Sequence, residues 1–229
     1  MFIAKKMLVS NIYSGARVEG VNITFPETKA IVDGANVGRL NMDEILVVHN
    51  LKAAWKYTLS NANAPISLDF ICRINEDVSR DESLEWGVLR KGRVGIGGTD
   101  YVPQIPSQEK TSEDIDAILS QEKSHTERAL ELYCYCCKKQ LFWDGNKRTA
   151  FIATNKYLID NGCGLLTIED RDVNEFNAKL IDYYNDENKK ELLKGFLYTN
   201  CINSASFFEM DETRKQYNVG QKSNEDVME

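Results

Sequence analysis

Apolar residues recur three and four positions apart over most of this chain, which is the spacing of amphipathic helices. The pattern is clearest in residues 42–59, where Asn41 followed by Glu44 also has the form of a capping box that opens a helix. Ser67 stands at the start of a second helical stretch. Further helices are predicted at residues 112–121, 125–139, 149–162, 169–186 and 189–201. The pattern therefore predicts a mainly α fold.

Two parts of the chain depart from this helical pattern. Residues 1–27 are predicted to be irregular or to form short strands, broken by Pro26. Residues 86–106 combine β-branched residues with glycines, which predicts a β-hairpin with Gly97 and Gly98 at its turn.

The chain ends in a polar, acidic stretch with few apolar positions, which we expect to be ordered only in part. These changes of pattern predict an N-terminal extension at residues 1–27, a main domain at 28–205 and a polar tail at 206–229. A chain of 229 residues is long enough for a main domain of this size to bury a real core.

Composition narrows the class of protein. Hydrophobic residues make up 42% and charged residues 28%, as in ordinary globular proteins. The net charge of −7 argues against broad affinity for nucleic acid or membranes, which both favour basic surfaces. The six cysteines form no CxxC pair, so reduced, buried thiols are expected rather than zinc ligands or disulfides. With no secretory signal in residues 1–15, we expect a cytoplasmic protein.

The run QLFWDGNKRT, residues 140–149, links two of the predicted helices and gathers most of the candidate chemistry. The following helix would offer free backbone N–H groups and the positive end of its dipole, which suit phosphate. Asp144 could hold Mg²⁺, while Lys147 and Arg148 would neutralise phosphate charge. The run therefore predicts a nucleotide or another phosphorylated ligand. The alternative is a solvated turn between helices, since Asp-Gly-Asn is common turn chemistry.

This run resembles the signature loop of the Fic/Doc (Fido) family, whose usual form is HxFx(D/E)GNxR. Residues 87–106 resemble the family's flap segment, with Gly87 and Arg90 at its G-x-x-R positions. Residues 33–45 resemble an N-terminal segment that often reads IEGNxLTxxE. The resemblance covers residues 28–200 and implies a Fic/Doc-type helical bundle with a small β-hairpin flap beside the active-site loop.

The resemblance implies Mg²⁺-dependent transfer of AMP from ATP to a hydroxyl side chain of a target protein, with release of pyrophosphate. ATP and an unidentified protein target are the implied partners, and the flap would hold the target in extended form. The implied site residues are Phe142 as the anchor of the loop, Asp144 as the metal ligand, Gly145, Asn146, Lys147 and Arg148 around the phosphates, and Gly97, Gly98 and Thr99 in the flap.

Two departures from the family pattern leave the reaction open. Gln140 stands where the family has its catalytic histidine, and an amide can orient a hydroxyl but cannot take up its proton near neutral pH. Lys147 replaces a glycine, and Phe151 stands where AMP-transferring members have a second arginine that helps hold the γ-phosphate. GNKRT is thus closer to the Doc form, DANKRT, whose branch includes a kinase toxin, although Gly145 matches the AMP-transfer form. A Doc-like kinase and an inactive, nucleotide-binding regulator or antitoxin-like partner therefore remain as alternatives.

The third departure concerns regulation. Many members carry an inhibitory helix, (S/T)xxxE(G/N), whose glutamate pairs with the second arginine. The best alignment here is KAIVDG, residues 29–34, a short helical turn with Asp33 in the glutamate position. Aspartate is one methylene shorter and Phe151 removes its partner, so Asp33 is expected to be a vestigial inhibitory position. The alternative is that Asp33 ends a helix, with Gly34 as its left-handed cap.

Overall fold

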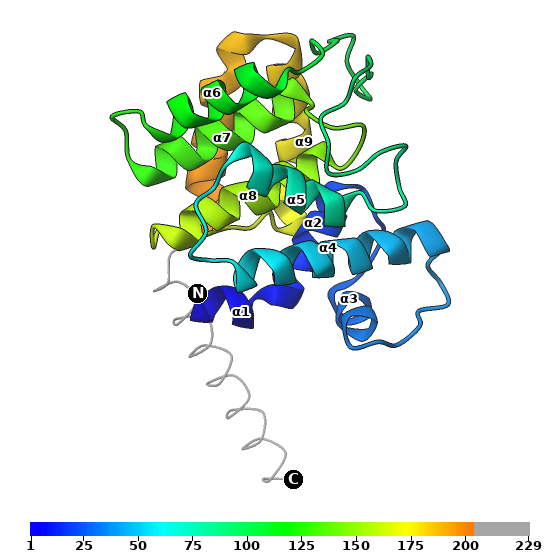
Figure 1. Ribbon diagram of the computed structural model, residues 1–229. Coiled ribbons are helices and arrows are strands. Elements are labelled where there is room, and N and C mark those ends of the chain that lie inside the picture. The colour runs from blue at the N-terminus through cyan, green and yellow to red at the C-terminus, as the bar shows by residue number, and fades with distance from the viewer. Residues whose placement is uncertain (204–229) are drawn as a thin grey trace, which may run out of the picture.

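The computed structural model describes residues 1–203, which form a helical body with one small sheet (Figure 1). The elements are α1 (Phe2–Lys6), α2 (Leu8–Val18), α3 (Phe25–Val32), α4 (Met42–Ser60), α5 (Leu68–Val78), α6 (Gln108–Leu119), α7 (His125–Lys139), α8 (Asn146–Asp160), β1 (Leu165–Leu166), α9 (Asp170–Asn185), the 3₁₀ turn η1 (Glu187–Lys189), α10 (Lys190–Phe196), the π turn η2 (Leu197–Cys201) and β2 (Ile202–Asn203). The prediction of a mainly α fold is confirmed.

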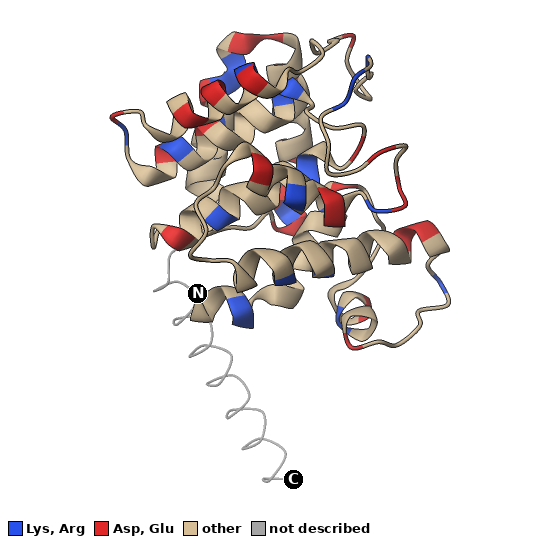
Figure 2. Ribbon diagram, in the orientation of Figure 1, with Lys and Arg blue, Asp and Glu red and all other residues tan. Residues whose placement is uncertain are grey.

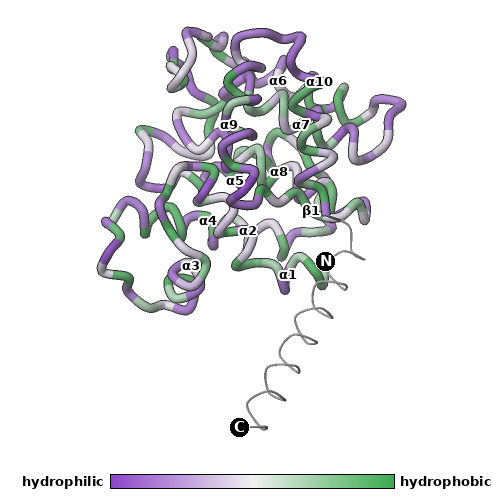
Figure 3. The backbone as a smooth tube through the Cα atoms, turned by 180° about the vertical axis from the view of Figure 1, so that it is seen from behind, coloured by the Kyte–Doolittle hydropathy of each residue, from purple (hydrophilic) through white to green (hydrophobic). Residues whose placement is uncertain are grey.

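Helix α8 is the centre of the fold. Every residue from Arg148 to Leu158 is buried, as expected for a helix with neighbours on all sides. These neighbours are α7, α5, α4 and α2. The Asn155 amide fixes β1 against α8, since it donates to Leu166 O at 3.0 Å and accepts from Leu166 N at 2.9 Å. Figure 3 shows the hydrophobic stretches on the inner helices and mainly hydrophilic loops around them.

The helix starts predicted from capping residues are confirmed. Asn41 Oδ1 accepts a hydrogen bond from Glu44 N at 2.9 Å, and Asn41 N donates one to Glu44 Oε2 at 3.0 Å. Ser67 Oγ accepts from Phe70 N at 3.2 Å and starts α5. These short, local contacts satisfy N–H groups that the helix itself cannot.

The prediction for residues 1–27 was wrong, because this stretch forms α1, α2 and the start of α3. Helix α2 places Ile12 and Ala16 in the core. Thr24 and Glu27 form a second capping box, and Pro26 lies in the first turn of α3, where its missing N–H costs nothing. The proline that was interpreted as a break therefore marks a helix start.

The flap segment, residues 87–106, runs beside the loop that follows α7, but its two arms are not paired as strands. The expected β-hairpin is wrong in this respect. The antiparallel pair in the described chain is β1–β2, with Leu165 opposite Asn203 and Leu166 opposite Ile202. Glycines give the flap arms few side chains to pair across. The buried guanidinium of Arg90 holds the arms together instead, by donating to Gly92 O at 2.5 Å and Gln104 O at 2.7 Å.

Two further expectations concern cysteines and membranes. The six cysteines are all free in this structure and four of them are buried, and burial raises the pKa of the Cys137 thiol to about 12. Among residues 1–203, no helix has the length and apolar character needed to cross a membrane. The predicted tail, residues 206–229, lies outside the described residues.

Candidate active site

The loop between α7 and α8 has a fixed, anchored backbone. Helix α7 ends at Lys139 and is capped by Gln140, which adopts a left-handed conformation with φ of 46°. Arg90 is 1% exposed, and it donates to the carbonyl oxygens of Gln140 at 2.5 Å and Lys139 at 3.3 Å. These bonds satisfy carbonyl groups that the end of α7 leaves open. Leu141 and Phe142 are buried directly after the turn, so the loop is anchored as the sequence predicted for Phe142.

Helix α5 supports the loop from behind and requires a glycine at position 145. Asn75 Nδ2 and Ser79 Oγ both donate to Asp144 O, at 3.0 and 2.9 Å. Gly145 has φ of +71°, and a Cβ atom there would lie 2.4 Å from Ser79 Oγ and 2.7 Å from Val78 Cγ1. The glycine is thus explained by the close approach of α5 and by its own backbone conformation.

The Asn146 side chain closes the loop on itself. Its Oδ1 accepts from Phe142 N at 2.9 Å, and its Nδ2 donates to Phe142 O at 2.9 Å. The sequence placed this amide in an anion hole, whereas its polar atoms are used inside the loop. The anion-binding groups that remain are the backbone N–H groups of the first turn of α8, which has no side-chain cap.

Asp144 lies at the mouth of this helix start. Its side chain is 47% exposed, and its Oδ1 accepts from Gly145 N at 2.5 Å, which leaves Oδ2 without a hydrogen bond in the described chain. Residues 1–203 contain no group of three or more His, Cys, Asp and Glu side chains that could hold a metal. A Mg²⁺ ion at Asp144 would therefore take its other ligands from phosphate oxygens and water, which is how this ion is commonly bound. The residues present fit such an ion.

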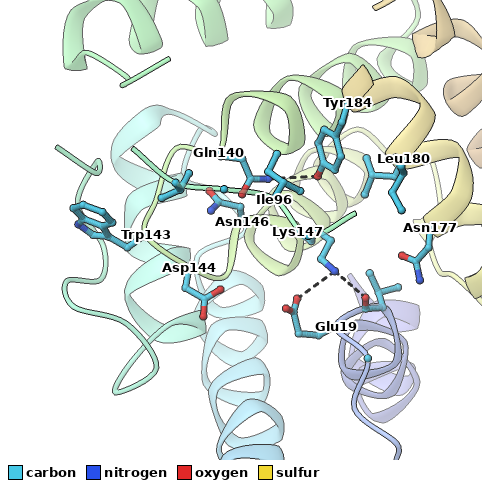
Figure 4. Close-up of a pocket in the computed structure, with 16 residues that line it drawn as sticks. Glu19, Ile96, Gln140, Trp143, Asp144, Asn146, Lys147, Asn177, Leu180 and Tyr184 are labelled. Carbon is cyan, nitrogen blue, oxygen red and sulfur yellow. Dashed lines mark hydrogen bonds and ion pairs between the residues drawn. The ribbon is translucent and has the colours of Figure 1, made fainter. Parts of the chain in front are cut away.

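A pocket of about 510 Å³ opens in front of α8 (Figure 4). It brings together Gln140, Asp144, Asn146 and Lys147 from the predicted set. The remaining walls come from Trp143 of the same loop, from the flap segment, from α9 and from the end of α2. The residues of the last three are Val94, Gly95, Ile96, Gly97, Asn177, Leu180, Ile181, Tyr184, Val18, Glu19 and Gly20.

The tip of the flap segment turns away from this pocket. Of the predicted flap residues only Gly97 lines it. Gly98 packs on Ile181, whose Cδ1 would lie 3.2 Å from a Cβ at position 98. Thr99 Oγ1 donates to Asn185 Oδ1 at 2.6 Å. The tip of the flap segment is therefore fastened to α9, and its middle faces the loop.

Gln140 points its amide toward α9. Its Nε2 donates to Cys137 O at 2.7 Å and to the Tyr184 hydroxyl at 3.4 Å, while its Oε1 accepts no hydrogen bond from the described residues. Burial raises the pKa of Tyr184 far above its usual value, so this phenol stays neutral. His125 lies at the start of α7, with Nδ1 3.1 Å from the Tyr157 hydroxyl. Neither His125 nor His49 lines the pocket, which therefore has no histidine to replace the missing base.

Arg148 is buried, and its guanidinium is surrounded by carboxylates. Its Nη1 donates to both oxygens of Glu82, at 3.0 and 2.8 Å, and its Nε lies 3.3 Å from Glu19 Oε2. Its Nη2 lies 3.7 Å from Asp144 Oδ1. Burial raises the pKa of Glu82, against the opposing effect of Arg148. Arg148 is thus placed under the loop, and Lys147 is the cation that faces the pocket.

Glu19 is the site residue that the sequence analysis missed. Its Oε2 lies 4.0 Å from Lys147 Nζ, which also donates to Val18 O at 3.2 Å (Figure 4). The signal was present, because residues 18–27, VEGVNITFPE, fit the family's IEGNxLTxxE more closely than residues 33–45 do. This alignment puts Glu19-Gly20 in the E-(G/N) position of the inhibitory pattern, although Gly15 stands in its Ser/Thr position.

Asp33 is far from this arrangement. It does not line the pocket, and its exposed carboxylate pairs with Lys29 Nζ at 2.5 Å, one turn earlier in α3. Gly34 follows with φ of +95°, so the alternative interpretation of Asp33 as a helix-ending residue is confirmed. Phe151 is buried and packs edge-on against Trp55, with 6.3 Å between the ring centres. In this chain, the position where AMP-transferring members have their second arginine is therefore part of the hydrophobic core.

Comparison with known proteins finds a family model and solved structures that this chain resembles. Residues 65–158 match the model of the Fic/DOC family. Fic-1 from C. elegans superposes with a TM-score of 0.73 at 19% identity, over 91% of this chain and 64% of that one. A Fic family protein from Desulfovibrio desulfuricans gives 0.66 at 18%, over 85% and 63%. A Fic domain containing signaling protein from Bacteroides thetaiotaomicron gives 0.67 at 17%, over 84% and 83%.

Their sequence identities to this chain are below 20%, so the superpositions establish a shared fold and nothing finer. This chain spans less than two thirds of the C. elegans and Desulfovibrio chains. No curated protein matches its sequence at a significant level. The match to the family model and these structures give the fold, and the reaction is a separate question.

Proposed function

We propose that this chain is a Mg²⁺-dependent transferase that moves AMP from ATP to a hydroxyl side chain of a target protein, at a rate lowered by Gln140. The observation that carries the proposal is the position of Asp144. Its half-exposed carboxylate stands beside the uncapped start of α8, in a pocket that the flap segment borders. A carboxylate and a helix start side by side suit a metal-bound polyphosphate.

Each pocket residue would have a defined part. The first N–H groups of α8 and the Lys147 ammonium would bind phosphate oxygens. Asp144 would hold Mg²⁺, whose charge would offset the negative charge of the phosphates. Gly97 and the neighbouring flap residues would border the segment of the target that carries the hydroxyl group.

The transfer itself needs little from Gln140. The hydroxyl oxygen forms a bond to the α-phosphorus, the bond to pyrophosphate breaks, and the hydroxyl proton must leave. The free Oε1 of Gln140 would accept the hydroxyl's hydrogen bond and orient it, but an amide cannot take the proton. The proton would pass to water or to a phosphate oxygen. Loss of a general base lowers a rate by about 10²–10⁴, which slows the reaction without removing metal and positioning effects.

Two alternatives have observations in their favour. The burial of Phe151 against Trp55 favours Doc-like transfer of the γ-phosphate, because the second arginine of the AMP-transfer form is missing. The enclosure of Arg148 by Glu82 and Glu19 favours an inactive, nucleotide-binding regulator, because this cation is bound within the protein.

The test is transfer of label to protein from ATP labelled on the α- or the γ-phosphate, with Mg²⁺, the purified chain and cell lysate. The proposal predicts label from the α-phosphate, lost in Asp144→Ala and kept in the matched control Asp33→Ala, whose carboxylate lies outside the pocket. Label from the γ-phosphate alone would favour the kinase. No label despite bound ATP would favour the regulator and reject both transfer reactions.

A further inference from the structure

The middle of the flap segment is an extended ribbon with two distinct faces. Along residues 91–97 exposure alternates with a period of two. Val94 and Ile96 are the half-buried positions and line the pocket, and Gly92 lies against the Trp143 ring. The exposed positions are Lys91, Arg93, Gly95 and Gly97; the two glycines also border the pocket, whereas the two charged residues do not. One face of the ribbon is therefore directed to the active-site loop and the other to solvent.

The backbone of this ribbon is unpaired. Among residues 1–203, the N–H groups of residues 93–97 find no acceptor, and the carbonyl groups of these residues accept one hydrogen bond, from Thr99 N to Ile96 O at 3.4 Å. An extended stretch with open N–H and C=O groups can take a further strand from another chain. The ribbon is held at both ends, by Arg90 at its start and by the bond from Thr99 to Asn185 at the tip.

The outward face carries two cations that the fold does not use. Lys91 and Arg93 are exposed, and neither forms an ion pair or a side-chain hydrogen bond with any described residue. The carboxylate nearest in sequence on the preceding loop, Glu85, accepts from Trp143 Nε1 at 3.3 Å. Figure 2 shows basic positions on the long segment that connects α5 and α6. The chain has a net charge of −7, so these two unpaired cations give the ribbon a charge opposite to that of the chain as a whole.

We infer that the flap ribbon selects target segments that carry acidic residues at odd-numbered positions from the modified hydroxyl. A strand added to the ribbon alternates in the same way, so a hydroxyl directed at Gln140 places its immediate neighbours on the outward face. With the hydroxyl residue opposite Val94, the neighbour on one side lies opposite Arg93, and the residue two further on lies opposite Lys91. Cross-strand pairs of opposite charge are favourable there. On the other side of the hydroxyl residue, the strand would lie opposite Gly95 and Gly97, which offer no charged side chain.

This inference rests on the proposed function, because the hydroxyl must face the loop, but its test does not require transfer. Binding of fluorescent serine peptides is measured by anisotropy at low salt. One pair of peptides carries aspartates at positions 1 and 3 before or after the serine, and isomeric peptides carry them at positions 2 and 4. The chain is compared with the double variant Lys91→Glu/Arg93→Glu and with Lys56→Glu, an exposed cation on α4 that has no ion pair. Circular dichroism checks that each variant is folded.

We expect one of the odd-position peptides to bind about fivefold or more tightly than its even-position isomer, which is the scale of two exposed cross-strand pairs. The double variant should lose or reverse this preference, and Lys56→Glu should keep it. Equal binding of the isomers, or an unchanged preference in the double variant, would overturn the inference. Label transfer without any such preference would leave the proposed function standing and reject the inference. A preference for the odd-position peptides without any label transfer would support the inference and reject the proposed function.

Discussion

The replacement Glu19→Gln tests how the pocket is regulated. Glu19 Oε2 lies 3.3 Å from Arg148 Nε and 4.0 Å from Lys147 Nζ, so under the proposed function it would compete with phosphate for the Lys147 ammonium. Glutamine keeps the shape of the side chain and removes its charge. We therefore expect Glu19→Gln to bind MgATP more tightly than the original chain.

The size of the effect follows from the charges. A phosphate charge about 5 Å from the Glu19 carboxylate is repelled by ~3 kcal/mol at an effective dielectric constant near 20. The side chain is 24% exposed, so water and salt screen much of this repulsion and leave ~1–2 kcal/mol. This corresponds to a Kd that is lower by about 5- to 30-fold.

Isothermal titration calorimetry with MgATP at two salt concentrations measures the change. Asp33→Asn is the matched control, since it removes a carboxylate that, among residues 1–203, pairs only with Lys29 on α3. An unchanged Kd in Glu19→Gln, or the same gain in Asp33→Asn, would show that Glu19 does not compete with phosphate. A gain that grows at high salt would also contradict the electrostatic explanation.

Three further predictions concern the base, the loop and a buried cluster. Gln140→His should raise label transfer by about 10²–10⁴ and add a pH dependence near the pKa of histidine, whereas no gain would mean that the loop is not set up for transfer. Gly145→Ala should lower the free energy of unfolding by ~3 kcal/mol and the melting temperature by about 10 °C. The causes are the clash of the new Cβ with Ser79 and the positive φ at this position. A melting temperature within about 2 °C of the original protein would refute this close contact. Burial alone would raise the pKa of Glu131, but hydrogen bonds from Lys194 and Lys190 lower it from 4.5 to about 2. The ionised Glu131 therefore stabilises the folded protein above about pH 5, and this contribution is lost as the pH falls toward 2. Lys194→Met should cost ~2 kcal/mol at pH 7 and flatten this acid dependence in urea titrations, and an unchanged slope would argue against the cluster.

The sequence predicted the elements whose signals are local. Helices α4 and α5 have capping residues next to long amphipathic patterns, and both start where these residues indicate. Helix α3 was reduced to a turn because the capping box of Thr24 and Glu27 was overlooked. The flap arms could not be predicted from their composition, since the contact that joins them is the buried guanidinium of Arg90.

The same distinction applies to the candidate site. The composition of the loop was enough to place Asp144 and Lys147 at one site, and the family resemblance added Gln140; all three line the pocket. It could not indicate that Arg148 is bound by Glu82, which lies 66 positions away in sequence. Nor could it assign the inhibitory position, because the contact between Glu19 and the loop depends on how α2 packs against α8.

The central claim is that Asp144, Lys147 and the start of α8 hold the phosphates of MgATP. Its most direct measurement is calorimetric titration of MgATP into Glu19→Gln, into Glu19→Gln with Asp144→Ala, and into Glu19→Gln with Asp33→Ala. We predict saturable binding that the Asp144→Ala replacement weakens by about tenfold or more, the loss of one metal ligand, and that Asp33→Ala leaves unchanged. No binding to Glu19→Gln, or equal binding to all three proteins, would contradict the account.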